Sequence, residues 1–149
     1  MPHKDLSGSP QMQQLIEKLA AKHGLNLAAT ESHQRLELEG YMPLVIEKIG
    51  RHLVSVAHYG VLNGDVMRDP EVVFLTNYPT WVPIEITQDY SSRYDNFATI
   101  TPRGQVVAWK PAGQAVLANF VSQWAENLRE QGWLDKAKGQ SLERDWVFR

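Results

Sequence analysis

Apolar and polar residues alternate through the middle of the chain, and this period of two limits the fold more than any other feature. Leu36 and Leu38 alternate with charged residues, and Val54 and Val56 alternate with small ones. Such alternation is typical of strands that bury one face of a sheet. The alternating runs are short, and turn residues separate them at 50–51, 63–64, 77–80 and 102–104. The sequence therefore predicts an antiparallel meander of about six strands.

The register of one central hairpin follows from keeping its apolar side chains together. Ile46 and Val56 belong to two apolar rows, one on each strand of the hairpin. If these two residues are paired, both rows lie on the same face of the sheet. The connection around Gly50 then has an odd number of residues. The same reasoning places a polar group on the second face of the sheet, namely Glu47, Ser55, Tyr59 and Glu85.

Two amphipathic helices flank the predicted sheet. Ser9 and Pro10 are a typical helix start, and Gly24 is a typical helix end. Between them lies one apolar stripe, formed by Met12, Leu15, Ile16 and Leu19. A stronger stripe precedes Gly132 and is formed by Leu117, Phe120, Val121, Trp124 and Leu128. The predicted fold class is α+β, with the meander flanked by an N-terminal and a C-terminal helix.

The length of 149 residues suits a single domain that spans 1–149. Residues 1–8 are polar, and we expect them to be frayed. Residues 135–149 are charged but contain apolar side chains, which we expect to dock on the body or on a second subunit: Leu142, Trp146, Val147 and Phe148.

Composition excludes several classes of function. The formal charge of −2 gives no basic footprint, so we expect no binding to nucleic acid. No apolar run has the roughly 18 residues that a membrane helix needs, so we expect no membrane contact. The absence of cysteine removes thiol catalysis and thiolate metal sites. Because the N-terminus also lacks the apolar stretch of a secretory signal, we expect a cytoplasmic protein.

The densest group of reactive side chains lies at residues 58–71. Asp65, Asp69 and Glu71 carry oxygen atoms of the kind that bind hard cations, and His58 precedes them. These residues are the candidates for a small metal-dependent hydrolase or nuclease.

A structural interpretation of the same residues is simpler. Asn63 and Gly64 suit a turn, and the Asp-Pro pair at 69–70 is typical of a break before a strand. Alternation turns His58 toward the core. We interpret residues 63–71 as a loop, but this loop lacks the residue order of an EF-hand. No nucleophile motif and no phosphate-binding loop occurs in the sequence. We therefore assign no catalytic residue, no metal site and no cofactor, and the pattern favours a non-enzymatic protein.

Binding residues are predicted from aromatic and polar side chains at hairpin ends and on the second sheet face. Aromatic residues at such places are enriched in interface hot spots. The candidates for ligand or partner binding are Tyr59, Arg68, Tyr78, Trp81, Glu85 and Tyr90. Arg68 is also expected to pair with a neighbouring carboxylate.

Three blocks of sequence resemble one uncharacterised family of small bacterial proteins. The blocks are YMPLVIEKIG at 41–50, LVSVAHYGVLNGDVMRDPEVVF at 53–74 and WVPIEITQD at 81–89. Members of that family are carried on plasmids, integrative elements and phages. The resemblance covers about Gly40 to Asp89 and, more loosely, the C-terminal helix. It implies an accessory protein of a mobile element and brings no catalytic residue with it.

Three hypotheses of function follow. The first is a non-enzymatic accessory protein of a mobile genetic element that acts through contacts with a protein partner or as a homodimer. The second is the small metal-dependent hydrolase or nuclease centred on the hairpin at 58–71. The third is a small-ligand binder that uses the second sheet face around Glu47, Tyr59 and Glu85.

Overall fold

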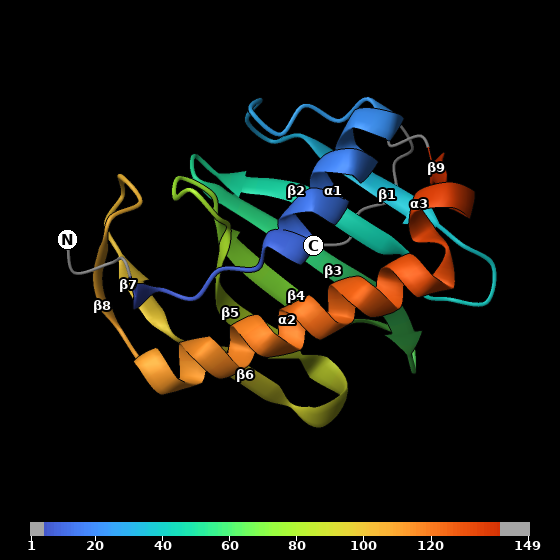
Figure 1. The fold of residues 1–149 in the computed structure, drawn as a ribbon. Helices are drawn as coiled ribbons and strands as arrows, with labels where there is room; N and C mark the ends of the chain where they lie inside the picture. Colours follow the sequence, from blue (N-terminus) through green and yellow to red (C-terminus); the bar gives the residue numbers. More distant parts are fainter. Residues whose placement is uncertain (1–4, 141–149) are drawn as a thin grey trace.

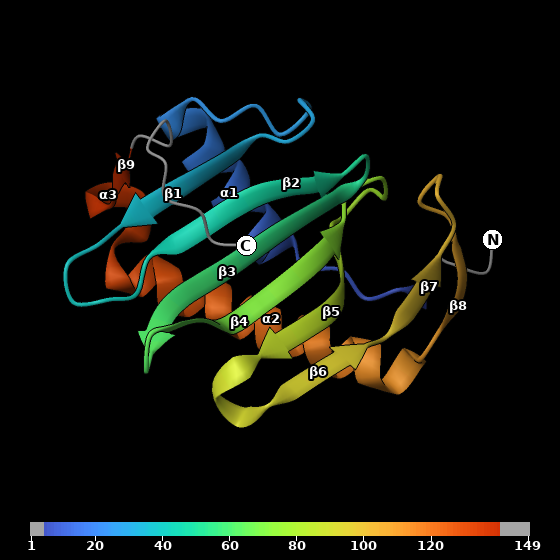
Figure 2. The ribbon, with the colours of Figure 1, turned by 180° about the vertical axis from the view of Figure 1, so that it is seen from behind.

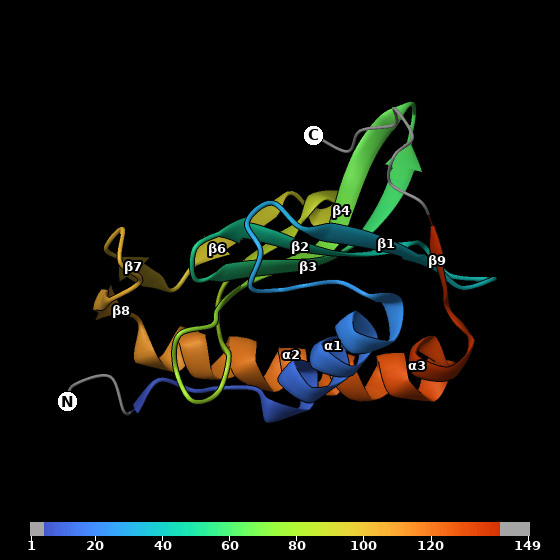
Figure 3. The ribbon, with the colours of Figure 1, turned by 90° about the horizontal axis from the view of Figure 1, so that it is seen from above.

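The chain folds as a layer of helices against one face of an antiparallel sheet. We describe residues 5–140 of a computed structural model. Figures 1 and 3 show that all three labelled helices lie on the same side of the sheet. Seen from behind, in Figure 2, the second face carries no α-helix of the described chain. This arrangement confirms the α+β class.

The described residues form three α-helices and nine strands, together with the 3₁₀ helix η2 (Asp89–Ser91). The helices are α1 (Pro10–His23), α2 (Pro111–Gln131) and α3 (Trp133–Lys136). The strands of the first half are β1 (His33–Glu37), β2 (Leu44–Gly50), β3 (Leu53–Leu62) and β4 (Asp65–Leu75). The later strands are β5 (Val82–Gln88), β6 (Arg93–Asn96), β7 (Ala98–Ile100), β8 (Val106–Trp109) and β9 (Lys138–Gln140).

Seven of these strands form one sheet in the order β6-β5-β4-β3-β2-β1-β9, and β7 and β8 form a separate pair. The prediction of an antiparallel meander of about six strands is confirmed by the seven-stranded sheet, and the separate pair of strands adds to it. Residues 96–101 do not form one strand, because the chain leaves the large sheet near Phe97 and starts the small one at Ala98. β9 was missed because three residues after a helix carry no readable alternation.

The predicted register of the central hairpin is confirmed. Ile46 pairs with Val56 and Glu47 pairs with Ser55, and the pairing shifts between Lys48 and Gly50. A second shift interrupts the pairing of β3 with β4 between Ala57 and Tyr59. Beyond that shift the end of the β3–β4 hairpin bends away from the helices, as Figure 3 shows.

This hairpin corrects the interpretation of residues 63–71 as a loop. Only Asn63 and Gly64 form the turn, and β4 already begins at Asp65. Both turn residues have positive φ, 53° and 84° respectively, as the Asn-Gly pair predicts. The polar residues from Asp65 to Glu71 are therefore strand residues, and the irregular pairing interrupts the alternation of side chains between Arg68 and Glu71.

The helix ends follow the predicted signals. The Ser9 hydroxyl accepts a hydrogen bond from the Met12 amide, and Pro10 is the first residue of α1. Gly24 and Gly132 end α1 and α2 with φ of 74° and 97°, a backbone conformation that favours glycine.

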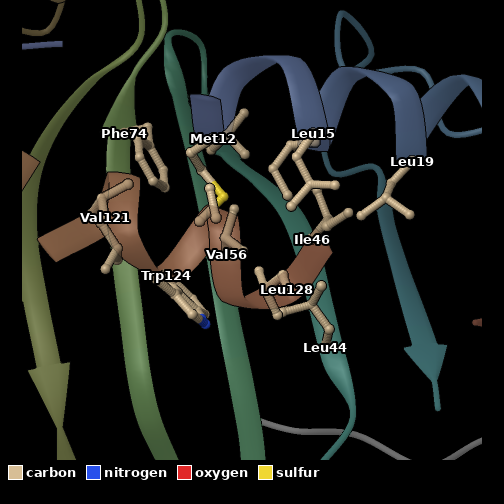
Figure 4. Close-up of a cluster of buried hydrophobic side chains, with 14 of the residues drawn as sticks. Met12, Leu15, Leu19, Leu44, Ile46, Val56, Phe74, Val121, Trp124 and Leu128 are labelled. Atoms are coloured by element: carbon tan, nitrogen blue, oxygen red, sulfur yellow. The ribbon is translucent and has the colours of Figure 1, made fainter. Parts of the chain in front are cut away.

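The main core lies between the helices and the sheet (Figure 4), and both predicted stripes contribute to it. Two aromatic residues differ from the prediction. Phe120 is 39% exposed, because its position on α2 turns it toward the outer side. Trp81 is buried and lies 5.7 Å from the Phe74 ring, centroid to centroid. Trp81 is therefore a core residue.

The described parts of the two predicted terminal segments, residues 5–8 and 135–140, contact the rest of the domain. Ser7 is held by hydrogen bonds of Gln114, so the N-terminal segment is fixed from at least this residue. The expected tail begins inside α3 and continues into β9, which pairs with β1 at the sheet edge. Residues 141–149, with the four apolar side chains predicted to dock, lie outside the described residues.

Candidate binding sites

A polar network on the second sheet face contains three residues that the sequence analysis named, and Arg68 is its centre. The three are Ser55, Arg68 and Glu71. Arg68 donates from Nη1 to Glu71 over 3.1 Å and from Nε to Asp89 over 3.1 Å. Its backbone amide also donates to Asp89, over 2.7 Å. Arg68 thus joins the base of the bent hairpin to the short 3₁₀ helix that follows β5. The expected pairing of Arg68 with a carboxylate is confirmed.

Glu71 is the buried member of this network. Its carboxylate accepts hydrogen bonds from Arg68 and from the Ser55 hydroxyl, the latter over 2.5 Å. Ser55 and Glu71 are both buried, on neighbouring strands of the same face. Because a buried carboxylate is costly without partners, these two donors explain how Glu71 is tolerated there.

The ion pair also changes the acid–base properties of its members. Burial opposes ionisation of Asp89, but the hydrogen bonds and charge of Arg68 outweigh it, so the pKa of Asp89 is below its usual value. The hydrogen bond to Asp89 raises the pKa of Arg68 further. Both groups are therefore charged at neutral pH.

A second pair stands beside the network. The Tyr94 hydroxyl donates to Glu85 over 3.0 Å. The pKa of Tyr94 is raised, chiefly by partial burial and to a smaller extent by this hydrogen bond. Together the two groups line an open pocket of about 460 Å³, whose walls include Arg68, Glu71 and Glu85. We call it the open-face pocket. Asp89 and Tyr94 were not singled out from the sequence, because their contacts depend on how β5 continues into β6.

His58 lies on the opposite side of the sheet from Glu71. Its ring centroid is 5.7 Å from that of Trp124 and 5.6 Å from that of Trp133, so it faces the helices as alternation predicts. Burial lowers its pKa, and hydrogen bonds to the backbone carbonyl groups of Pro43 and Met42 oppose that shift in part. Because carbonyl oxygens only accept, Nδ1 carries the proton.

The hydrolase candidates are consequently not gathered. Asp65 is exposed at the hairpin end, opposite Leu62, while Glu71 lies beneath the bend and His58 lies on the helical side. Among residues 5–140 no group of three His, Asp or Glu side chains is arranged to hold a metal ion. Asp69 lies in the irregular stretch of the pairing between β3 and β4.

The remaining predicted aromatic residues are divided between core and surface. Tyr59 is on the second face, as predicted, but it is buried in a small apolar cluster with Val45 and Ala57. The second face is therefore not uniformly polar. Tyr90 is exposed, and Tyr78 lines a different and larger pocket.

That pocket lies where the N-terminal segment meets the β4–β5 loop and β8. It has a volume of about 930 Å³, and we call it the apolar pocket. No charged side chain lines it; its walls are Leu6, Gly8, Pro10, Tyr78, Pro79, Thr80, Val82, Gln105, Val106 and Val107.

Buried hydrogen bonds fix the walls of the apolar pocket in place. The side-chain amide of Gln114 accepts from the Ser7 amide and donates to the Ser7 carbonyl, both over 2.7 Å. The Ser9 amide donates to the Trp81 carbonyl over 3.0 Å. A Cβ atom on Gly8 would lie 2.6 Å from Cγ2 of Thr80, so only glycine allows this close approach. The pocket is therefore formed before any ligand binds.

A sequence signal for this pocket exists, although aromatic residues alone do not reveal it. Residues 6–16, 76–84 and 111–125 contain no Asp, Glu, Lys or Arg. The structure brings parts of all three runs together around the N-terminal segment, through Ser7, Trp81 and Gln114. A scan for uncharged runs would have found them, but only the fold shows that they meet.

The chain is thus a two-layer α+β protein with an apolar pocket at the N-terminal segment and a charged network on the second sheet face. It belongs to the family described as a domain of unknown function, DUF6908, whose model matches residues 12–134. No curated protein and no solved structure matches the chain. No helix among residues 5–140 is both long and apolar enough to cross a membrane.

Proposed function

We propose that the protein is a non-enzymatic binding module and that its apolar pocket receives an apolar side chain or short apolar segment of a partner protein. The observation that carries this proposal is a preformed pocket of about 930 Å³ without a charged lining residue. Interface centres are depleted of charge, and hot-spot residues cluster in desolvated pockets. Gln114 and Gly8 hold the walls in place, so little ordering entropy is lost on binding.

The test compares two substitutions of exposed strand valines. Val107 lies at the pocket and is 62% exposed, whereas Val61 is 70% exposed near the end of the β3–β4 hairpin, on a different element. Val107→Arg introduces a charge into the pocket, and Val61→Arg is the matched control. A random peptide library displayed on phage is selected on the wild-type protein, and the affinities of the selected peptides are measured by calorimetry for all three proteins.

We expect the selected peptides to be rich in aromatic and aliphatic residues and poor in charge. Val107→Arg should weaken their binding at least about tenfold, or about 1.4 kcal/mol, and Val61→Arg should leave it unchanged. Selection of charged peptides, or equal affinities for both variants, would show that the pocket is not the docking site.

We also propose that this binding serves a mobile genetic element in the bacterial cytoplasm. The support is the resemblance of residues 41–50, 53–74 and 81–89 to a family carried on such elements. The genes around family members test it. Neighbouring genes for transfer, integration or phage assembly are expected in most genomes, whereas a constant chromosomal neighbourhood would contradict the proposal.

The open-face pocket supports a second candidate, the binding of a small polar ligand. Its support is the placement of Arg68, Glu71 and Glu85 around one pocket of about 460 Å³. A panel of amino acids and small amines is screened by thermal denaturation of the wild-type protein and of Glu85→Gln. A compound that stabilises only the wild type supports this candidate; equal shifts for both proteins, or none, count against it.

A further inference from the structure

The second sheet face carries a buried apolar cluster, although no described α-helix lies over it (Figure 2). Val45 is 3% exposed, Ala57 is 1% exposed and Tyr59 is 4% exposed. All three belong to β2 and β3, and no other described element contributes a residue to this cluster. Side chains stand roughly perpendicular to a sheet, so their outer atoms are exposed where nothing covers them. Two strand valines at the surface, Val61 and Val107, are accordingly 70% and 62% exposed.

The last described residue of the chain lies in the same row as the cluster. Gln140 of β9 pairs with Arg35 of β1. Arg35 in turn pairs with Val45, and Val45 pairs with Ala57. Residues paired directly across antiparallel strands point to the same face of the sheet. Gln140 therefore points to the second face, three strands from Ala57, and three strand spacings amount to about 14 Å.

The residues that follow Gln140 have the composition and the length to reach the cluster. Residues 141–149, which we call the end segment, include three consecutive apolar residues, namely Trp146, Val147 and Phe148. The six residues from Ser141 to Trp146 span up to about 20 Å when extended, at roughly 3.3 Å per residue. This reach exceeds the distance of about 14 Å across the sheet.

The burial of the cluster is found within a single chain, so its cover is expected to belong to the same chain. Residues 1–4 also lie outside the described range, but they precede Leu6, which lines the apolar pocket beside β8 and packs in a different cluster. The end segment instead begins at the edge of the large sheet, in the row of Val45 and Ala57. A segment tethered so closely acts at an effective concentration of the order of millimolar.

We propose that the end segment docks on the second sheet face of its own chain and that Trp146, Val147 and Phe148 cover the cluster of Val45 and Ala57. The sequence alone left the body and a second subunit open as docking places, and the row from Gln140 to Ala57 favours the body. The cluster is thus an interaction surface that the chain itself occupies. This inference concerns a surface separate from the apolar pocket and does not depend on the proposed peptide binding.

The absence of cysteine allows a direct test by thiol labelling. Ala57→Cys introduces a small apolar side chain with a reactive group into the cluster, and its reaction with a thiol reagent depends on exposure. The rate is measured in the otherwise unchanged full chain and in combination with Trp146→Asp. Ser141→Asp is the matched control, because it adds the same charge to the same segment. Ala125→Cys, which lies in the main core, reports opening of the whole domain.

We expect the thiol of Ala57→Cys to react at least about ten times faster in combination with Trp146→Asp than in combination with Ser141→Asp. The rate for Ala125→Cys should not change with either substitution. Equal rates for the two combinations with Ala57→Cys would overturn the inference. A parallel rise for Ala125→Cys would also overturn it, because the domain would then open as a whole and the end segment would not be a separable cover.

A second measurement separates docking within one chain from docking between two chains. The labelling rate of Ala57→Cys in the full chain should not depend on protein concentration, whereas protection that increases with concentration would show that a second copy supplies the cover. In a chain that ends at Gln140 the same thiol should react faster. A synthetic peptide of residues 141–149 should restore its protection, and the peptide with Trp146→Asp should not. Equal effects of the two peptides would contradict the proposed contact.

Discussion

Arg68 connects a buried carboxylate, that of Glu71, to a surface one, that of Asp89, so its removal deprives Glu71 of its ion pair. Breaking a buried pair costs about 3–5 kcal/mol, but the Arg68 side chain is 40% exposed and water screens part of that loss. We expect Arg68→Ala to lower the free energy of unfolding by about 1–3 kcal/mol in urea titrations. Arg93→Ala removes the surface pair with Asp95 and should cost less than about 1 kcal/mol. Equal losses for the two variants would contradict a special role for Arg68.

His58 makes stability depend on pH in a defined direction. Its folded-state pKa is lowered, chiefly by burial, below the ordinary value of 6.5. The unfolded chain therefore binds a proton more readily, and the contribution of His58 is complete above pH 6.5 and is lost as pH falls toward the folded pKa. We expect His58→Gln to reduce the fall in unfolding free energy between about pH 7 and pH 5. The pKa of His23 is lowered as well, so the same measurement on His23→Gln shows how much of the fall in unfolding free energy comes from His23 instead. An unchanged pH profile for His58→Gln would show that another group titrates.

For single residues, the sequence predicted the face to which a side chain points better than the residues that it contacts. Alternation placed His58 toward the helices, and the opposite charges near Arg68 predicted its pairing. Tyr59 and Trp81 stay predictions as partner residues, but both are buried, because a side chain at a hairpin end can still be covered by tertiary packing. Asp89 was missed as the second partner of Arg68, since residues 21 apart meet only through the sheet order.

Among the elements, the N-terminal segment depends on one side chain of α2. Gln114 is fully buried and bonds to both backbone groups of Ser7 and to the Pro83 carbonyl. Gln114→Met keeps the shape but leaves these groups without partners, which should cost about 2 kcal/mol. Hydrogen exchange should accelerate at Ser7 and Ser9 and change little at Leu15 within α1. Gln123→Met, an exposed site on α2, should leave exchange and stability nearly unchanged. Uniform acceleration in α1 as well would show that the segment and the helix open together.

Elements with a strong period were predicted well, and short ones were not. The stripes of α1 and α2 and the pairing of β2 with β3 follow from many residues that agree. The sequence predicts a loop over residues 65–71, because aspartate and proline are depleted in strands. Their pairing with β3 outweighs that weak propensity. β9 exists only because α3 returns the chain to the edge of β1, which no local pattern encodes.

For the whole molecule, a single cooperative domain over 1–149 remains a prediction. Its basis is one main core to which α1, α2, α3 and the central strands all contribute. Three buried tryptophans lie in that core, namely Trp81, Trp124 and Trp133. Tryptophan fluorescence therefore reports on the packing of the helices against the sheet. Circular dichroism at the helical minimum reports on the helices themselves. If the layers depend on one another, the two signals change together in urea, as expected for a two-state transition.

The small sheet of β7 and β8 is the sharpest challenge to this cooperativity. A two-stranded ribbon is marginal by itself, so its order must come from packing against the rest. Its buried residues Ala98 and Val106 pack with Val82 and Ile84 of β5, which also pairs within the large sheet. We therefore expect amide exchange in β7 and β8 to require nearly the same unfolding free energy as exchange in β5. Exchange from β7 and β8 at a much lower free energy, or a fluorescence transition separate from the circular dichroism transition, would show that the chain contains more than one folding unit.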